Sequence, residues 1–283
     1  MTESKPLVMR SVAAMRREVA RWKAAGETVG VVPTMGALHA GHLSLIRSAI
    51  AGCDRVIVTI FVNPTQFAAN EDLDSYPRGE AADLAKLAAL GADLAFCPNP
   101  DEMYPDGFAT SVKVEGLTEV MCGAGRPHHF GGVATVVSKL FIQSQADRAY
   151  FGEKDFQQCL VVTRMARDLD IPIEVVPVET VREADGLAMS SRNAYLSDVH
   201  RTVAPAIYKT IRDVAASVRE GQAPATAAAH GVEALKAAGI ERVEYLDVRD
   251  AETLAEEWPE GRAARVFIAV HLGETRLIDN VAV

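Results

Sequence analysis

The first two thirds of the chain alternate short apolar runs with longer segments whose apolar residues recur at helical spacing. After Ser11, an expected N-cap, such a segment continues until Gly26. The same patterns predict further helices near 42–51, 80–90, 132–143 and 155–169, and strands at 29–33, 55–62, 93–97, 146–151 and 173–178. This alternation favours an α/β fold with a parallel sheet covered by helices on both faces.

The pattern changes after about residue 180. Helices are expected over 199–220 and 226–238, followed by strands at 243–248, 265–271 and 275–278. We therefore expect two domains, a larger α/β domain over 1–180 and a smaller α+β domain over 181–283.

Composition narrows the class of protein. The chain has 283 residues, 49% of them hydrophobic, which is enough for a large core. Its formal net charge of -9 disfavours general binding to nucleic acids or anionic membranes. No 18-residue apolar run or secretory leader is evident, and Cys53, Cys97, Cys122 and Cys159 form no C-x-x-C pair. Reduced thiols in a cytoplasmic protein are expected.

A glycine-containing stretch over 33–42 joins the first long strand to the helix after it. Gly36 and Gly41 permit positive φ and close approach of a ligand, and the N-terminus of a helix attracts phosphate. The spacing of His39 and His42 resembles the nucleotide-binding signature of the nucleotidyltransferase superfamily. From this segment alone, a structural helix cap and a metal site remain alternatives.

Two further segments follow strand ends, so the parallel sheet would bring them to the same crevice as 33–42. Asn63 and Gln66 are amides that suit a polar substrate, although Asn63 can instead cap a turn. Lys154 can neutralise a phosphate, and Asp155 can meet a ribose hydroxyl or cap a helix. Gln158 lies one helical turn further on.

Two other segments carry basic side chains that could bind an anion. Ser190, Ser191 and Arg192 would make an anion clamp near the domain boundary, or a serine-rich hinge. Arg126 and His129 form another basic spot, but the histidines lack the cysteine or carboxylate partners of a zinc site. A serine hydrolase fits poorly because no G-x-S-x-G elbow is present.

Together these motifs resemble the pantoate–beta-alanine ligase family across essentially the whole chain. The segments that carry the resemblance are PTMGALHAGH, IFVNPTQF, GRPHHFGGVATVVSKLF, FGEKDFQQ and DGLAMSSRNAYL. The resemblance implies ATP, (R)-pantoate and beta-alanine as substrates, a pantoyl-adenylate intermediate, and release of pyrophosphate and AMP. It also implies magnesium as a cofactor, a homodimer, a Rossmann-like doubly wound sheet and a C-terminal domain that acts partly as a lid.

The resemblance also implies roles for individual residues. His42 is the expected acid/base or proton-donating group, and His39, Lys154 and Arg192 join it as catalytic candidates. The expected ATP-binding residues are Met35, Gly36, Ala37, Leu38, His39, Ala40, Gly41, His42, Gly152, Glu153, Lys154, Asp155, Val181, Met189, Ser190, Ser191 and Arg192. The expected substrate-binding residues are Gln66, Gln158, Asn63, Arg126 and His129.

The chain departs from the family pattern in a few places. Thr65 stands where methionine is expected, His128 where a small residue is commoner, and Gly131 where arginine is usual. The magnesium ligands are unknown, with Asp83 as one candidate. Another nucleotidyltransferase that stops at the nucleotidyl product, and a nucleotide-sensing module without turnover, remain the alternative functions.

Overall fold

The computed structural model describes residues 5–67, 73 and 76–283. Internal contacts divide the chain into two compact units. The first unit contains the ranges Met1–Glu119, Gly123–Gly152 and Gln157–Val178. The second unit contains Val120–Cys122, Glu153–Phe156 and Glu179–Val283. The short turn 153–156 therefore belongs with the C-terminal part of the chain, although strand and helix residues of the first unit flank it.

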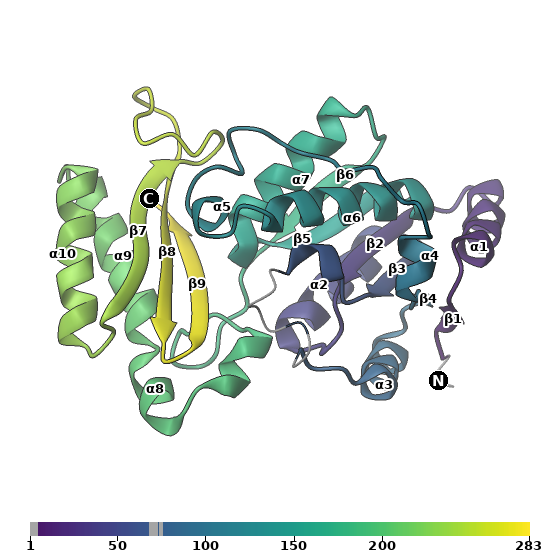
Figure 1. Ribbon diagram of the computed structural model, residues 1–283, viewed down its shortest axis with the longest axis horizontal. Helices are drawn as coiled ribbons and strands as arrows, with labels where there is room; N and C mark the ends of the chain where they lie inside the picture. Colours follow the sequence, from purple (N-terminus) through teal and green to yellow (C-terminus); the bar gives the residue numbers. More distant parts are fainter. Residues whose placement is uncertain (1–4, 68–72, 74–75) are drawn as a thin grey trace. The chain divides into compact units, whose positions relative to one another are not determined.

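A six-stranded parallel sheet forms the centre of the first unit (Figure 1). Its strands are β1 (Leu7–Met9), β2 (Val29–Thr34), β3 (Arg55–Ile60), β4 (Leu94–Phe96), β5 (Arg148–Gly152) and β6 (Glu174–Val178), in the order β1-β4-β3-β2-β5-β6. The order reverses beside β2, and ligands of such sheets bind at the carboxyl ends of the strands next to this reversal. The predicted Rossmann-like α/β class is confirmed; the pattern did not predict the three-residue strand β1.

Helices flank this sheet, and local signals explain several of their ends. They are α1 (Val12–Ala24), α2 (Ala40–Gly52), α3 (Glu80–Leu90), α4 (Pro100–Met103), α5 (Cys122–Gly125), α6 (His129–Ser144) and α7 (Phe156–Asp168). Ser11 caps α1 as predicted, since its side chain accepts the backbone N–H of Ala14 at 3.3 Å. Val32 and Val58 pack with Ile46 of α2 in one buried cluster, which holds α2 against the central strands.

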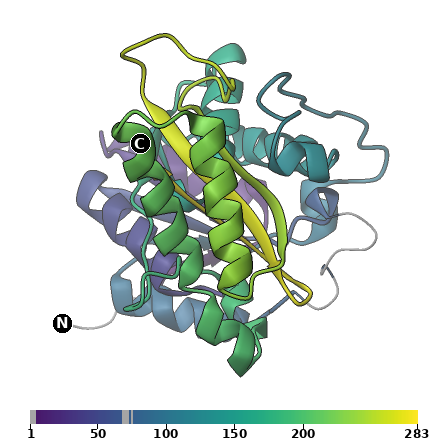
Figure 2. The same cartoon turned by 90° about the vertical axis from the view of Figure 1, so that its left-hand side faces the viewer.

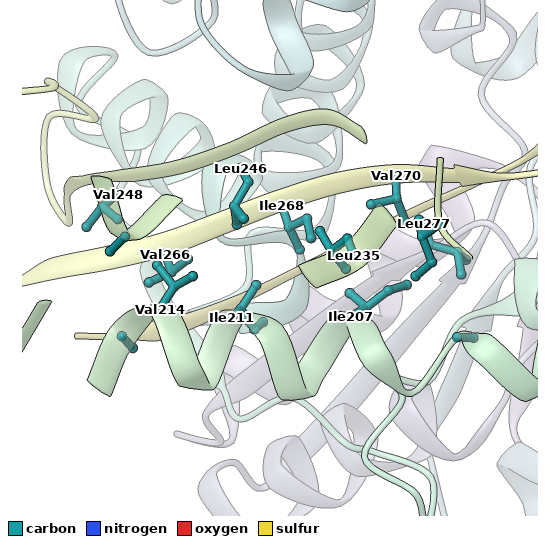
Figure 3. Close-up of a cluster of buried hydrophobic side chains, with 14 of the residues drawn as sticks. Ile207, Ile211, Val214, Leu235, Leu246, Val248, Val266, Ile268, Val270 and Leu277 are labelled. Atoms are coloured by element: carbon teal, nitrogen blue, oxygen red, sulfur yellow. The ribbon is translucent and has the colours of Figure 1, made fainter. Parts of the chain in front are cut away.

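The second unit pairs helices with an antiparallel sheet in the order β7-β8-β9. Its elements are α8 (Asp198–Val203), α9 (Ala206–Arg219), α10 (Pro224–Ala237), β7 (Arg242–Asp250), β8 (Ala264–Leu272) and β9 (Thr275–Ala282). Figure 2 shows α9 and α10 side by side over the sheet. Ile211 of α9, Leu235 of α10 and Ile268 of β8 meet in its apolar core (Figure 3).

Two expectations for the second unit were wrong in extent. The helix expected over 199–220 is two helices, because Pro205 has no N–H to donate and its ring obstructs a continuous helix. The strand expected to end at Ile278 continues to Ala282. Asp279 and Asn280 interrupt the apolar pattern, yet both are buried and paired with β8. In the described part of the chain, no helix is long and apolar enough to cross a membrane.

Candidate active site

The loop between β2 and α2 carries the two histidines of the first motif. His39 is the N-cap of α2, and its Nδ1 accepts the backbone N–H of Gly41 at 3.1 Å. His42 reaches back so that its Nδ1 accepts the backbone N–H of His39 at 3.3 Å. The ring centroids are 4.1 Å apart. The structure thus bears out the helix-cap interpretation, and the cap uses the Nδ1 atom of each ring.

This cap determines the chemistry that the rings can offer. A neutral imidazole has one N–H, so a ring that accepts at Nδ1 must carry its proton at Nε2. His39 and His42 therefore each present Nε2 as a hydrogen-bond donor beside the N-terminus of α2. Hydrogen-bond donors at a helix N-terminus suit the oxygen atoms of a phosphate.

Asp83 of α3 holds the same loop in place. Its Oδ2 accepts the N–H of Ala37 and its Oδ1 the N–H of Leu38, both at 2.8 Å, and the residue is 1% exposed. Gly36, with φ of +83°, passes so close that an added Cβ would lie 3.2 Å from Asp83 Oδ2. Both carboxylate oxygens are therefore engaged by the backbone, so Asp83, the magnesium candidate of the sequence, anchors the loop.

We expect Asp83→Ala to lower the free energy of unfolding by about 2–4 kcal/mol, since two backbone N–H groups lose their acceptor inside the protein. Asp83→Asn should lower it by less, because the amide oxygen can still accept one of the two bonds. Denaturant unfolding of the three proteins measures the difference. Equal stability of the alanine variant and the parent would contradict the anchoring role.

The turn η1 (Pro64–Gln66) follows β3 and approaches the same loop. Gln66 Nε2 lies 2.9 Å from the Sδ atom of Met35, and the backbone oxygen of Gln66 lies 3.1 Å from His129 Nδ1. The structure thus brings together three sequence-predicted pieces within the first unit: the loop 35–42, Gln66 and His129.

Asn63 organises this turn from inside. Its Oδ1 accepts from Tyr104 Oη at 2.8 Å and from the Thr65 backbone N–H at 3.3 Å, while its Nδ2 donates to Gly132 O at 3.2 Å. Asn63 is 1% exposed, and burial raises the pKa of Tyr104. Asn63 therefore has the turn-capping role that the sequence left open, and contact with a substrate stays a prediction.

The other candidates of the first unit lie on α7 and before α6. Gln158 lies half-buried on α7, while its neighbour Gln157 is buried and donates to the backbone oxygen of Leu117 at 2.8 Å. Arg126 precedes α6 and is half-buried, and His128 is exposed. Among residues 5–67, 73 and 76–283, no group of three histidine, cysteine or carboxylate side chains could hold a metal ion.

The turn that carries Lys154 is held within the second unit. This turn, η2 (Glu153–Asp155), has Glu153 O and Lys154 O as acceptors of Asn280 Nδ2, at 2.8 and 2.9 Å. Lys154 Nζ lies 3.6 Å from Asp155 Oδ1, and its side chain is 19% exposed against 46% for Asp155. Asp155 lies in this turn, directly before α7, and its role as a helix cap stays a prediction.

The segment 181–192 folds back on itself. Met189 N donates to Val181 O at 2.9 Å, and an isolated bridge pairs Arg182 with Ala188. Ser190 caps the following turn η3 (Ser191–Tyr195), since its Oγ accepts the N–H of Arg192 at 3.2 Å. Ser191 and Arg192 are half-buried in η3. The structure therefore brings Val181 and Met189, two of the predicted residues, together.

Arg182 is a residue that the sequence motifs did not single out. Its guanidinium donates to both oxygens of Asp279, at 2.6 and 3.0 Å, and to Gly186 O at 3.1 Å. Burial raises the pKa of the Asp279 carboxyl, an effect that Arg182 opposes. Arg182 and Asp279 are 97 residues apart in sequence, so no local pattern predicts that they pair. The one signal in the sequence was the position of an arginine just before the motif over 185–196.

Comparison with known proteins identifies the family of this chain. The family model described as pantoate-beta-alanine ligase matches residues 7–282. The chain is similar to the pantothenate synthetase of Caulobacter vibrioides, with 57% identity, 98% of this chain and 99% of that protein covered. That of Dinoroseobacter shibae is 54% identical with the same coverage.

Two solved structures that are similar in fold belong to the same family. The pantothenate synthetase of Thermus thermophilus superposes with a TM-score of 0.90 at 48% identity, covering 97% of this chain and 98% of that one. The pantoate-beta-alanine ligase of Francisella tularensis, described as complexed with beta-gamma ATP and beta-alanine, gives 0.81 at 31% identity, covering 98% and 97%. The chain therefore belongs to the pantoate–beta-alanine ligase family of AMP-forming ligases.

Proposed function

We propose that this protein joins (R)-pantoate to beta-alanine in two steps. A pantoate carboxylate oxygen attacks the α-phosphorus of ATP, the bond to pyrophosphate breaks, and pantoyl-adenylate forms. The amine of beta-alanine then attacks the acyl carbon, the bond to AMP breaks, and the nitrogen loses a proton. The family match over residues 7–282 carries this proposal.

The first step needs donors, because a carboxylate approaching ATP brings like charges together. We assign the loop Met35 to His42 to the ATP phosphates, with the Nε2–H groups of His39 and His42 donating to phosphate oxygens. The support is the cap geometry, which leaves Nε2 as the protonated nitrogen of each neutral ring. Gln66, whose amide lies against Met35, and Gln158 are assigned to pantoate, with Asn63, Arg126 and His129 around them.

In the second unit, we assign four side chains to the ATP phosphates: Lys154, Ser190, Ser191 and Arg192. The backbone near Val181 is assigned to the adenine, and Met189 to the same ATP site. Charge and donor type support this assignment, because an ammonium, two hydroxyls and a guanidinium all suit phosphate oxygens. Gly152, Glu153 and Asp155 complete the proposed ATP set. We also propose that the second unit serves partly as a lid that protects the adenylate from water, and that the protein is a cytoplasmic homodimer.

We propose that magnesium enters the site bound to ATP. The described residues form no three-ligand cluster, and Asp83 already binds two backbone N–H groups. A magnesium ion on nucleotide phosphates keeps several waters and needs at most one or two carboxylates, so this residue set fits an ion held mainly by the substrate. Bound there, it would neutralise phosphate charge.

The decisive experiment measures AMP released from ATP with purified protein across a small panel of hydroxy acids. We expect AMP only when pantoate and beta-alanine are both present, and exchange of labelled pyrophosphate into ATP with pantoate alone. A stable nucleotidyl ester would indicate the nucleotidyltransferase alternative. ATP binding without AMP release under any acyl donor would indicate a sensing module.

Gly132→Ala should raise the KM for pantoate about tenfold. At Gly132, an added Cβ would lie 2.4 Å from Thr65 O and 2.7 Å from the Cα of Gln66, so the backbone that carries Gln66 must shift. A misplacement of about 1 Å commonly reduces a rate about 100-fold, so tenfold is a moderate expectation. Steady-state kinetics with varied pantoate measures it.

The neighbouring glycine provides the matched control. At Gly131 nothing lies within 4 Å of an added Cβ, although both glycines lie on α6. Gly131→Ala should therefore leave the KM for pantoate within about twofold of the parent, as expected for a substitution without steric conflict. If both variants changed the KM alike, the position of Gln66 would not be the cause.

A further inference from the structure

Strand β9 carries two adjacent buried polar residues that point to opposite faces of its sheet. Asp279 and Asn280 are each 3% exposed. Neighbouring side chains on a strand alternate between faces. Each of the two engages a different segment of the second unit, so one strand contacts both segments that we assign to ATP.

Asn280 holds the turn that carries Lys154. Its Nδ2 donates to two successive backbone oxygens, Glu153 O at 2.8 Å and Lys154 O at 2.9 Å. Arg265 of β8 donates to Asn280 Oδ1, which requires the amide nitrogen to face the turn. The Arg265 guanidinium also lies 3.9 Å from the ring centroid of Phe156, the residue after the turn.

Asp279 holds the other segment. Its carboxylate accepts both bonds of the Arg182 fork and also the backbone N–H of Asn280 at 2.8 Å. Arg182 in turn lies 3.7 Å from the ring centroid of Tyr208 on α9 and follows Val181 directly. The adjacent backbone of 181–189 is thereby tied to β9.

We infer that Asn280 is a positioning residue that holds the backbone of Lys154 for the reaction with ATP, with Asp279 doing the same for the segment 181–189. This inference rests on the proposed function. A side chain that must meet a phosphate is effective only if its backbone is already in place, and the backbone oxygens of 153 and 154 are held by a single amide. Neither residue needs to touch a substrate.

The test uses Asn280→Asp, which keeps the size of the side chain and an acceptor for Arg265 but cannot donate to the two backbone oxygens. We expect pantoate-dependent pyrophosphate exchange to fall about 10- to 100-fold. In a Lys154→Met background the same change should add less than about twofold, because a residue that acts through Lys154 has nothing left to position. Independent, multiplying effects of the two changes would overturn the inference.

Two further readouts separate positioning from a general loss of stability. Ile211→Val, in the apolar core of the same unit, weakens packing without touching the turn, and should keep exchange within about twofold of the parent. Amide hydrogen exchange should become faster at 153–156 in Asn280→Asp and at 181–189 in Asp279→Asn, each without the other. Unchanged protection at 153–156 would refute the anchor whatever the activity.

The same measurements distinguish this inference from the proposed function. If the parent protein shows no pantoate-dependent exchange, the proposed function fails, and the role of Asn280 in that reaction fails with it. If the parent exchanges and Asn280→Asp exchanges equally fast, only the positioning role of Asn280 is refuted.

Discussion

His42→Ala is expected to slow pantoyl-adenylate formation about 100- to 1,000-fold, the usual loss when one preorganised donor to developing charge is removed. In the structure, His42 Nδ1 is occupied by the backbone N–H of His39, so Nε2–H is the donor of the neutral ring. The loss should appear in kcat as well as in kcat/KM if the bond strengthens in the transition state. Pyrophosphate exchange with pantoate present measures it.

Two conservative variants separate the cap from the chemistry. In His42→Asn the amide oxygen can replace Nδ1 as the acceptor, but no donor stands where Nε2–H was, so activity should be as low as in the alanine variant. His42→Gln can place an amide N–H further out and should recover part of the rate. His230→Ala, an exposed histidine on α10, is the matched control and should retain full activity. Full activity in His42→Asn would remove His42 from the reaction.

Lys154→Met is expected to lower adenylate formation to a similar degree, about 100- to 1,000-fold. Methionine keeps the length and apolar packing of the stem and removes only the charge. The Lys154 side chain is largely buried, and its Nζ is 3.6 Å from Asp155, so the ammonium is held close to the turn. Single-turnover formation of pantoyl-adenylate at saturating ATP, followed by rapid quench, measures the chemical step apart from nucleotide affinity.

Lys154→Arg restores a positive charge on a longer side chain and should recover only part of the lost rate. A planar guanidinium and a compact ammonium bind phosphate oxygens with different geometry. Lys236→Met is the matched control, because this exposed lysine on α10 pairs only with nearby Glu233 among the contacts described for it. Its activity should equal that of the parent. A Lys154→Met protein with unchanged adenylate formation would show that the charge contributes nothing to the step.

Local patterns in the sequence were sufficient for most of the fold. Strand-length apolar runs and helical spacing predicted the α/β class, and the Ser11 cap was correct in detail. The errors came where a local rule was overlooked or overridden. Pro205 divides an apparently continuous amphipathic segment, and β9 continues through Asp279 and Asn280, two polar residues that a strand pattern rejects.

The candidate site also has a part that the sequence predicted and a part that it did not. The motif residues could be found from glycine, histidine and lysine spacing, because these chemical types recur at strand ends for reasons local to the turn. The residues that hold these motifs in place could not be found from the sequence. Asp83 binds Ala37 and Leu38 across 46 and 45 residues, and Asn280 binds Glu153 across 127.

The sequence by itself therefore determined the kind of fold, the family, and which short segments carry donors suited to phosphate. Hydrophobic periodicity, caps and turn residues act over a few neighbouring positions, so they are legible along the chain. Only the tertiary structure decided that Nδ1 of both histidines is used by the backbone, that Asp83 is an anchor, and that β9 ties down the segments of Lys154 and Val181. Those contacts join residues far apart in sequence, and no local pattern encodes where the chain returns.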